Sequence, residues 1–304
     1  MSGSPQPGNI GVCAFCCANG PLQESHVLPA FLFRWLRKRS GTGHIRDTEN
    51  INRRVQDGLK LPWLCVDCEG RFSRHETAFA TKVFHPWMAG NNSIAYDDWM
   101  LKFCVSVSWR ILRFARGRNK DASYTSEQNL LMDQAEARWR DFLNDEAPHP
   151  ASFEQHLLIV DEIAETSIDD LPNNTNRFLM GSVTLDIVGS KRSLMTFAKM
   201  GRFMLFGIIQ KGEATWEGTK IHVRHGALKP GRFTIPAGIL DLIREKAGHF
   251  AAAMDRISPT QRAKIDNHIR DNLDTFAASE QFASIMADIR MFGKDAVLWK
   301  PESS

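Results

Sequence analysis

The chain has 304 residues, enough for about two domains. Its composition is that of an ordinary globular protein, with 43% hydrophobic and 24% charged residues. This excludes a disordered chain, collagen and a heptad rod, and no apolar run reaches the roughly 18–20 residues of a membrane-spanning helix. The 38 basic and 35 acidic residues leave a net charge of +3, which alone predicts no polyanionic partner. The opening residues MSGSPQPGN lack the basic and apolar regions of a secretion signal, so we expect a cytoplasmic protein with no membrane contact.

The N-terminal part is expected to combine short strands with two helices. A short strand is predicted around His26, and Pro29 suits the start of a helix over Ala30–Arg39. Residues 40–60 are polar and are interpreted as a loop. An apolar strand over Leu61–Leu64 then precedes a second helix, which begins at Asp67, ends near Phe84 and is closed by Pro86.

The remaining chain is predicted to pack helices on a mostly antiparallel sheet. A three-to-four-residue apolar period predicts a helix over 97–116, and Thr125 with Gln128 has capping-box spacing before another. Alternating apolar residues favour a sheet with one buried face. The predicted strands are His156–Asp161, Leu179–Val188, Leu194–Lys199, Phe203–Gln210 and Thr219–Arg224. Helices follow Pro236 and Ser258, and the last is expected to end near Gly293. The polar stretch at 90–92 is the predicted boundary between domains 1–90 and 91–304.

Four of the six cysteines form two matched pairs, Cys13-x2-Cys16 and Cys65-x2-Cys68. Each turn brings two thiolates to one side of the backbone, and two such turns can complete a tetrahedron around zinc with bonds of about 2.3 Å. Four sulfur ligands leave no open position, so the predicted zinc is structural. The alternatives are reduced buried cysteines, or a redox C-x2-C, which accounts for one pair only.

Two segments beside these cysteines carry a resemblance to a known family. "ESHVLP" contains His26 between the two cysteine pairs, and "WLCVDCEGRF" places Glu69 directly after the last cysteine. Over residues 10–85 the chain resembles the zinc-containing branch of the HNH endonucleases, which have a treble-clef, ββα-metal fold. The resemblance implies an α+β chain with this zinc domain first and a larger helix–sheet domain after it.

The resemblance also implies roles for individual residues. His26 matches the general base that activates a water to attack phosphorus, and an imidazole suits this work at neutral pH. Glu69 matches a ligand of a catalytic divalent ion, and Mg²⁺ prefers oxygen ligands. Glu76 lies seven residues further along the helix, on nearly the same side. Ser25 stands where the family has a metal-binding acid or histidine, and Asp57 is the nearest acceptor in place of the family's middle asparagine.

Basic residues gather in two stretches despite the small net charge. Between Arg34 and Lys60 there are eight Lys or Arg against three acids, and between Lys102 and Lys120 there are six and no acid. Such clusters are typical of phosphate contacts, and equally of solvated helix faces. The first cluster adjoins the predicted active site, so we expect nucleic acid to contact Arg34, Arg37, Lys38, Arg39, Arg53 and Arg54. In the second, Lys102, Arg110 and Arg113 are expected opposite the apolar face of their helix.

The sequence therefore predicts a metal-dependent endonuclease that hydrolyses phosphodiester bonds, with DNA favoured over RNA. His26, Glu69, Glu76 and Asp57 are the candidate catalytic residues. A restriction or phage-defence role follows from the family resemblance alone. The alternatives are a non-catalytic zinc module that binds nucleic acid or protein, and a thiol redox protein. Residues 91–304 carry no motif, and could hold substrate, a partner protein or a second copy of the chain.

Overall fold

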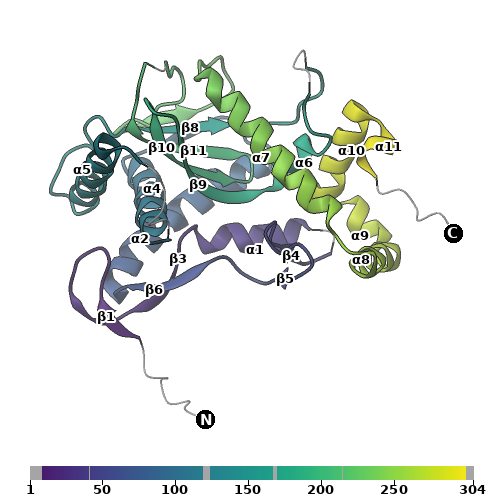
Figure 1. Cartoon of the computed structure of the whole chain (residues 1–304), viewed down its shortest axis with the longest axis horizontal. Helices are drawn as coiled ribbons and strands as arrows, with labels where there is room; N and C mark the ends of the chain where they lie inside the picture. The colour runs from purple at the N-terminus through teal and green to yellow at the C-terminus, as the bar shows by residue number, and fades with distance from the viewer. Residues whose placement is uncertain (1–8, 41, 119–123, 167–169, 214, 299–304) are drawn as a thin grey trace, which may run out of the picture.

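The structure is a computed structural model that describes residues 9–40, 42–118, 124–166, 170–213 and 215–298. Helices and antiparallel strands both contribute, which confirms the mixed helix-and-sheet prediction (Figure 1). The largest sheet is central, and the last helices gather at one end of the molecule. Within the described part of the chain, no helix is both long enough and apolar enough to cross a membrane.

The N-terminal segment forms three two-stranded antiparallel ribbons, which pair β1 with β2, β3 with β6 and β4 with β5. Their bounds are β1 (Ile10–Val12), β2 (Asn19–Pro21), β3 (Gln23–His26), β4 (Ile45–Arg46), β5 (Arg54–Val55) and β6 (Lys60–Leu64). The expected loop over 40–60 thus contains β4 and β5. In the β3–β6 ribbon His26 lies opposite Lys60, and Ser25 lies opposite Leu61. Because successive residues of a strand point to opposite faces, these two pairs occupy different sides of the ribbon.

The N-terminal helices differ from the prediction only at the end of the second. Helix α1 (Ala30–Arg39) begins after Pro29 as expected. Helix α2 (Val66–Phe79) continues through a π-helical turn, η1 (Ala80–Phe84), into α3 (His85–Met88). The predicted stop at Pro86 is wrong, because the helix continues through the π-helical turn and Pro86 lies in the first turn of α3.

Helices α4 (Trp99–Arg118) and α5 (Ser126–Leu143) follow, and both match predicted elements. The capping box before α5 has both of its hydrogen bonds. The Gln128 N–H donates to the Thr125 hydroxyl, and the Thr125 N–H donates to the Gln128 side chain. Helix α4 is buried along most of its length, because it packs on α2, on α5 and on one face of the central sheet. This position makes α4 the connection between the N-terminal segment and the sheet.

The central sheet is antiparallel, with strand order β8-β11-β10-β9. Its strands are β8 (Gln155–Ile159), β9 (Val183–Gly189), β10 (Leu194–Met200) and β11 (Phe203–Gln210). The expectation of one buried face is wrong for β10 and β11, which are buried on both sides. Ala198 and Leu205 belong to the core shared with α4, whereas Phe197 and Phe206 belong to a second cluster. Helix α7 (Ala237–Asp255) contributes to this second cluster and crosses the sheet in Figure 1.

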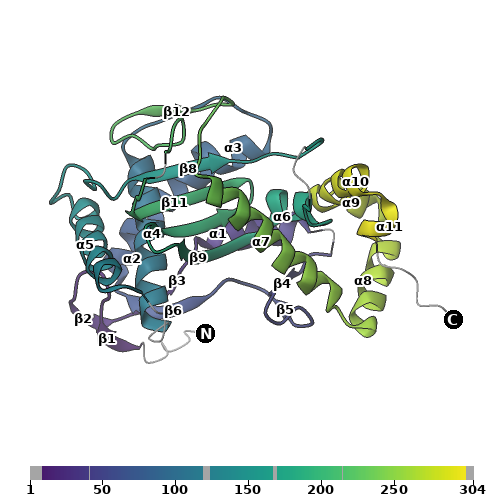
Figure 2. The ribbon, with the colours of Figure 1, turned by 45° about the horizontal axis from the view of Figure 1, so that its top comes forward.

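Two predicted strands have different bounds or are absent. The segment predicted as a strand from Leu179 begins as helix α6 (Thr175–Gly181), so the strand there is shorter. Residues 219–224 run beside β8 with one isolated bridge at Lys220, without forming a strand. The chain instead pairs β12 (Gly226–Leu228) with β7 (Ile94–Tyr96) at the edge of the molecule (Figure 2).

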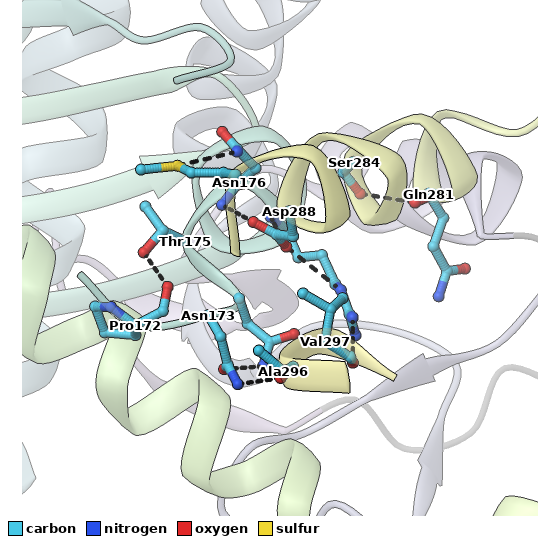
Figure 3. A network of polar contacts seen from close by, with 12 residues as sticks. Pro172, Asn173, Thr175, Asn176, Gln281, Ser284, Asp288, Ala296 and Val297 are labelled. Carbon is cyan, nitrogen blue, oxygen red and sulfur yellow. Dashed lines mark hydrogen bonds and ion pairs between the residues drawn. The ribbon is translucent and has the colours of Figure 1, made fainter. Parts of the chain in front are cut away.

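A buried carboxylate is among the contacts that fix the C-terminal helices to the rest of the molecule. They are α8 (Pro259–Asp271), α9 (Leu273–Ala277), α10 (Glu280–Phe292) and α11 (Lys294–Val297), so α11 extends the chain beyond the helix end predicted near Gly293. Asp288 on α10 accepts the backbone N–H groups of Asn176 at 2.7 Å and Arg177 at 3.2 Å, at the start of α6 (Figure 3). The Arg177 guanidinium in turn donates to the carbonyl of Val297. The contacts fasten α10 and α11 to α6.

One hydrophobic core runs through both predicted domains. Phe72 of α2 and Phe15 contact Trp109 of α4, and Phe79 stacks on Phe103 with ring centroids 4.0 Å apart. The same cluster continues to Phe203 of β11. The boundary at 90 remains a prediction, but apolar side chains on both sides of it share one interior.

Candidate metal centre and adjacent groove

The four paired cysteines meet at the N-terminal end of the molecule. Sγ atoms of Cys13, Cys16, Cys65 and Cys68 all lie within 4.8 Å of one another. The first pair lies after β1, and Cys65 is the N-cap of α2, so Cys68 falls in that helix's first turn. A helix N-terminus favours negative charge, but burial and the neighbouring cysteines raise the pKa of the Cys68 thiol.

The cluster has dimensions that suit zinc. A tetrahedron with Zn–S bonds of about 2.3 Å has S···S edges of about 3.8 Å, and the Sγ atoms of Cys16 and Cys65 are 3.7 Å apart. The backbone N–H of Cys65 donates to Cys13 Sγ at 3.3 Å. Burial raises the pKa of the Cys13 thiol, but hydrogen bonds from the backbone of Cys16, Cys65 and Phe15 outweigh burial and lower it to about 7. Four cysteines in this arrangement could bind a metal such as zinc.

The neighbouring Cys17 does not belong to the cluster. It is exposed and has a left-handed backbone conformation with φ of 62°, so the chain turns away directly after Cys16. Its backbone N–H donates to the carbonyl of Cys13 at 2.9 Å, which closes the turn of the first pair.

His26 at the end of β3 is held by the carboxylate expected from the sequence. Its Nε2 lies 2.9 Å from Asp57 Oδ1, and the second oxygen of Asp57 lies 2.6 Å from Lys60 Nζ. Burial raises the pKa of Asp57, but the bonds from Lys60, His26 and the Gly58 backbone outweigh it and lower the pKa to about 2. An ionised carboxylate can only accept, so Nε2 donates and Nδ1 is left as the ring's acceptor.

Packing fixes the plane of the His26 ring. The ring stacks on Phe33 of α1, with centroids 6.1 Å apart and an interplanar angle of 20°. Phe33 occupies this place because Gly58, next to Asp57, has no side chain: a Cβ there would lie 2.1 Å from the Phe33 ring. The glycine therefore allows one aromatic ring to support the histidine from the α1 side.

The two carboxylates of α2 have different surroundings. Glu69 is half-buried, and within the described residues it has no cationic partner. Glu76, with 17% of its side chain exposed, forms an ion pair with Arg110 of α4 at 2.6 Å. Burial raises the pKa of the Glu76 carboxyl, and Arg110 acts in the opposite direction. Arg110 also donates to the backbone carbonyl of His26 at 3.0 Å, so one guanidinium joins α4 to α2 and to β3.

A groove of about 850 Å³ brings three of the four predicted catalytic residues together. It lies between α1 and the α2–η1–α3 segment. The side chains of His26, Glu69 and Glu76 line it, whereas Asp57 contacts His26 from outside the groove lining. Ala278, Ser279 and Glu280, at the start of α10, form its far end. The groove is thus built from both the N-terminal and the C-terminal parts of the chain.

The predicted nucleic-acid residues separate into two groups. Arg34, Lys38 and Arg39 line the groove, and Arg37, Arg53 and Arg54 lie on the exposed surface outside its lining. Arg39 is committed to other contacts, since it pairs with Glu280 at 3.3 Å and lies over the Trp35 ring.

The second basic stretch does not form the exposed stripe that the sequence suggested. Arg110 is buried, because its long side chain reaches Glu76 inside the protein instead of pointing to solvent. Lys102 pairs with Asp145, and Arg113 pairs with Glu136. Lys120 lies outside the described residues.

The residues around His26 do not form a second three-ligand metal cluster. Ser25 is buried and donates to the carbonyl of Gln23, so it is turned away from the groove. Among the residues that the structure describes, the four cysteines are the one group of three or more His, Cys, Asp or Glu ligands. Mg²⁺ usually keeps several waters and takes one or two carboxylates together with substrate phosphates. Glu69 could supply one such carboxylate, whereas the Glu76 carboxylate is already paired with Arg110.

Sequence analysis missed two features of the site. The buried role of Arg110 was hidden, because position 110 falls on the predicted polar side of α4, and no local pattern shows that α2 covers it. The hydroxyls of Ser73 and Thr77, four residues apart on α2 and both exposed to the groove, could have been found from their helical spacing.

Comparison of the chain with protein family models, curated proteins and solved structures finds no match.

Proposed function

We propose that the protein is a metal-dependent endonuclease whose N-terminal segment is a treble-clef, ββα-metal domain of the HNH type. One observation carries the proposal. His26, which is bonded to a carboxylate at 2.9 Å, lines the same groove as Glu69 and as two cations, Arg34 and Lys38, and none of these three has an ion pair within the described residues. Support also comes from the β3–β6 ribbon, whose second strand leads directly into α2, with α1, β4 and β5 inserted between its two strands in the chain. A zinc at the four cysteines would fix β1 and the start of α2 relative to each other.

The chemistry assigned to His26 follows from its hydrogen bond. With Nε2–H donated to Asp57, Nδ1 accepts a proton from a water as that water's oxygen bonds to phosphorus. The P–O bond to the leaving group breaks, and the leaving oxygen takes its proton from solvent. Asp57 then faces an imidazolium, whose charge it stabilises without accepting the proton itself. Asp57 is a positioning residue in this scheme, and His26 is the catalytic base.

Glu69 is assigned to a divalent ion that substrate phosphate would help to hold. Such an ion supplies electrostatic stabilisation of the charge that develops on the phosphate. Arg34 and Lys38, exposed on α1 along the same groove, supply fixed positive charge for the phosphates that flank the scissile bond. The proposed substrate is nucleic acid, with DNA favoured, and a restriction or phage-defence role would use this activity.

A plasmid-nicking assay with Mg²⁺ or Mn²⁺ tests the proposal. Nicking should require added metal and fall by about 100-fold or more in both His26→Ala and Glu69→Ala, with zinc content unchanged. His249→Ala, which removes an exposed histidine of α7, is the matched control and should nick like wild type. Equal nicking by all four proteins would identify a contaminating nuclease and contradict the proposal.

The second candidate is a non-catalytic module that binds nucleic acid. The observation that favours it is the commitment of Glu76 to Arg110 at 2.6 Å, which leaves fewer free ligands beside His26. This candidate predicts DNA binding by wild type and by His26→Ala alike, with no metal-dependent cleavage by either.

A further inference from the structure

Beyond the His26 end, the groove has two rows of polar side chains that the proposed chemistry does not use. Arg34 and Lys38 lie one helical turn apart on α1. Ser73, Thr77 and Thr81 lie at four-residue intervals along α2 and η1. All five are exposed, so the groove has a cationic wall and a hydroxyl wall.

Within the described residues, none of these five side chains pairs with another side chain. Arg39, Lys102, Arg110 and Arg113 all form ion pairs, whereas in the described structure neither Arg34 nor Lys38 does. Thr81 donates its hydroxyl to the Thr77 carbonyl and keeps its oxygen as an acceptor. Ser73 and Thr77 have no hydrogen bond from their hydroxyls within the described residues. Arg34, Lys38, Ser73 and Thr77 therefore carry charges and hydroxyls that a ligand in the groove can contact.

The shape of the groove favours one strand of nucleic acid over two. Proteins that bind a duplex insert a convex helix or ribbon into its grooves, whereas single strands lie in a concave basic channel that follows the backbone. Here α1 and α2 flank a recess, and edges of Phe31 and Trp35 contribute to its lining. Ser279 and Glu280 close the far end, where Glu280 pairs with Arg39.

We propose that this groove holds single-stranded nucleic acid next to the scissile phosphate, with the strand's phosphates between the cations of α1 and the hydroxyls of α2. The proposal rests on the proposed function for the position of the scissile bond. It adds that the substrate is unpaired where it enters the groove. From His26, the bound nucleic acid would run along the groove toward α10, and it would end or turn where Glu280 closes the groove.

Binding measured by fluorescence anisotropy tests this proposal separately from cleavage. The probes are a labelled short oligothymidylate, the matching oligouridylate and the duplex of each, with His26→Ala as the background protein and no added divalent metal. At least one of the two single strands should bind about tenfold more tightly than its duplex. The double variant Arg34→Gln/Lys38→Gln should weaken single-strand binding about tenfold and reduce the slope of log K against log[salt] by about 1.4, since each phosphate contact contributes about 0.7.

The control is Lys191→Gln/Arg192→Gln, which removes the same charge from an exposed turn outside the groove. It should leave the affinity within about twofold of the background protein. Ser73→Ala/Thr77→Val removes the hydroxyls without changing charge, and should weaken binding with the salt slope unchanged. Equal or tighter duplex binding, or equal loss in the two charge variants, would overturn the proposal. Either result can occur whether or not the wild-type protein nicks DNA, so failure of the groove proposal is distinguishable from failure of the nuclease proposal.

Discussion

His26 is bonded to a carboxylate, where the resembled family has an amide. Asp57 holds the ring through Nε2 at 2.9 Å and is itself held by Lys60 at 2.6 Å. The negative charge of a carboxylate stabilises an imidazolium, which an amide does only weakly. The pair thus orients the proposed base and favours the form that it would take after accepting a proton.

Removing Asp57 should therefore reduce cleavage without removing it. We expect Asp57→Ala to lower the single-turnover rate by about 10- to 100-fold, because the ring loses its orientation and its counter-charge. Asp57→Asn can still accept from Nε2–H and should recover part of that loss. Rates equal to wild type in the alanine variant would contradict the role assigned to this contact.

The pKa of Asp57, about 2, gives this contact a defined pH dependence. The folded pKa lies below the ordinary value of 3.8 for an aspartate, so the stabilisation is complete above pH 3.8 and is lost as the pH falls through about 2. Asp57 should stay ionised at every pH above 4. NMR of the labelled carboxyl carbon should show no Asp57 titration between pH 4 and 8, and a midpoint inside that range would contradict the assignment.

At the scale of elements, helix α2 carries several residues of the site along its length. Its first turn carries Cys68 and Glu69, and its middle carries Glu76, which reaches α4. The helix, its cysteine pair and the placement of Glu69 and Glu76 on nearly the same side could be predicted from the sequence. Helical spacing and C-x2-C turns are local properties. The sequence could not predict that Arg110 covers Glu76, because that contact joins positions 34 residues apart through packing of separate helices.

The Arg110–Glu76 pair should be an energetic connection between α4 and α2. Removing Arg110 leaves a buried carboxylate without its partner, so we expect Arg110→Met to lower the free energy of unfolding by about 3 kcal/mol. Adding Glu76→Gln removes the unpaired charge and should restore part of the loss. Urea unfolding of wild type, both single variants and the double variant measures this coupling, and additive losses would show that the pair is not coupled.

The four-cysteine cluster should determine whether the N-terminal ribbons stay folded. We expect one zinc per chain by elemental analysis, and loss of that zinc in Cys68→Ser. Cys17→Ser changes an exposed neighbour outside the cluster and should retain the metal. Zinc retained by Cys68→Ser, or absent from the wild-type protein, would contradict the assignment.

At the scale of the whole molecule, the groove needs segments from both ends of the chain. Residues of α1 and α2 form its walls, and Glu280 of α10 closes it. The antiparallel character of the central sheet and most of its strands followed from the sequence, because alternation and apolar runs mark strands locally. The covering of both faces by α4 and α7, and the return of α10 to α1, depend on long-range packing that a single sequence does not display.

Asp288 connects this C-terminal wall to helix α6 and should make that attachment pH-dependent. Burial raises the Asp288 pKa to about 6, although the N–H groups of Asn176 and Arg177 act against it. A carboxyl whose folded pKa exceeds its unfolded value stabilises the fold fully below about pH 4, and this contribution is lost as the pH rises through about 6.

Wild type should therefore lose about 2 to 3 kcal/mol of stability relative to Asp288→Asn between pH 4 and 8. Thermal or urea unfolding of both proteins across that range measures the difference. Parallel stability curves would contradict the raised pKa.

The central claim is that His26 is the base of a phosphodiester hydrolysis in this groove. The most direct measurement is the single-turnover cleavage rate of His26→Ala relative to wild type, on a DNA substrate with Mg²⁺, for two proteins matched in zinc content and melting temperature. The rate in the variant should be at least about 100-fold lower. A variant that cleaves at the wild-type rate would contradict it.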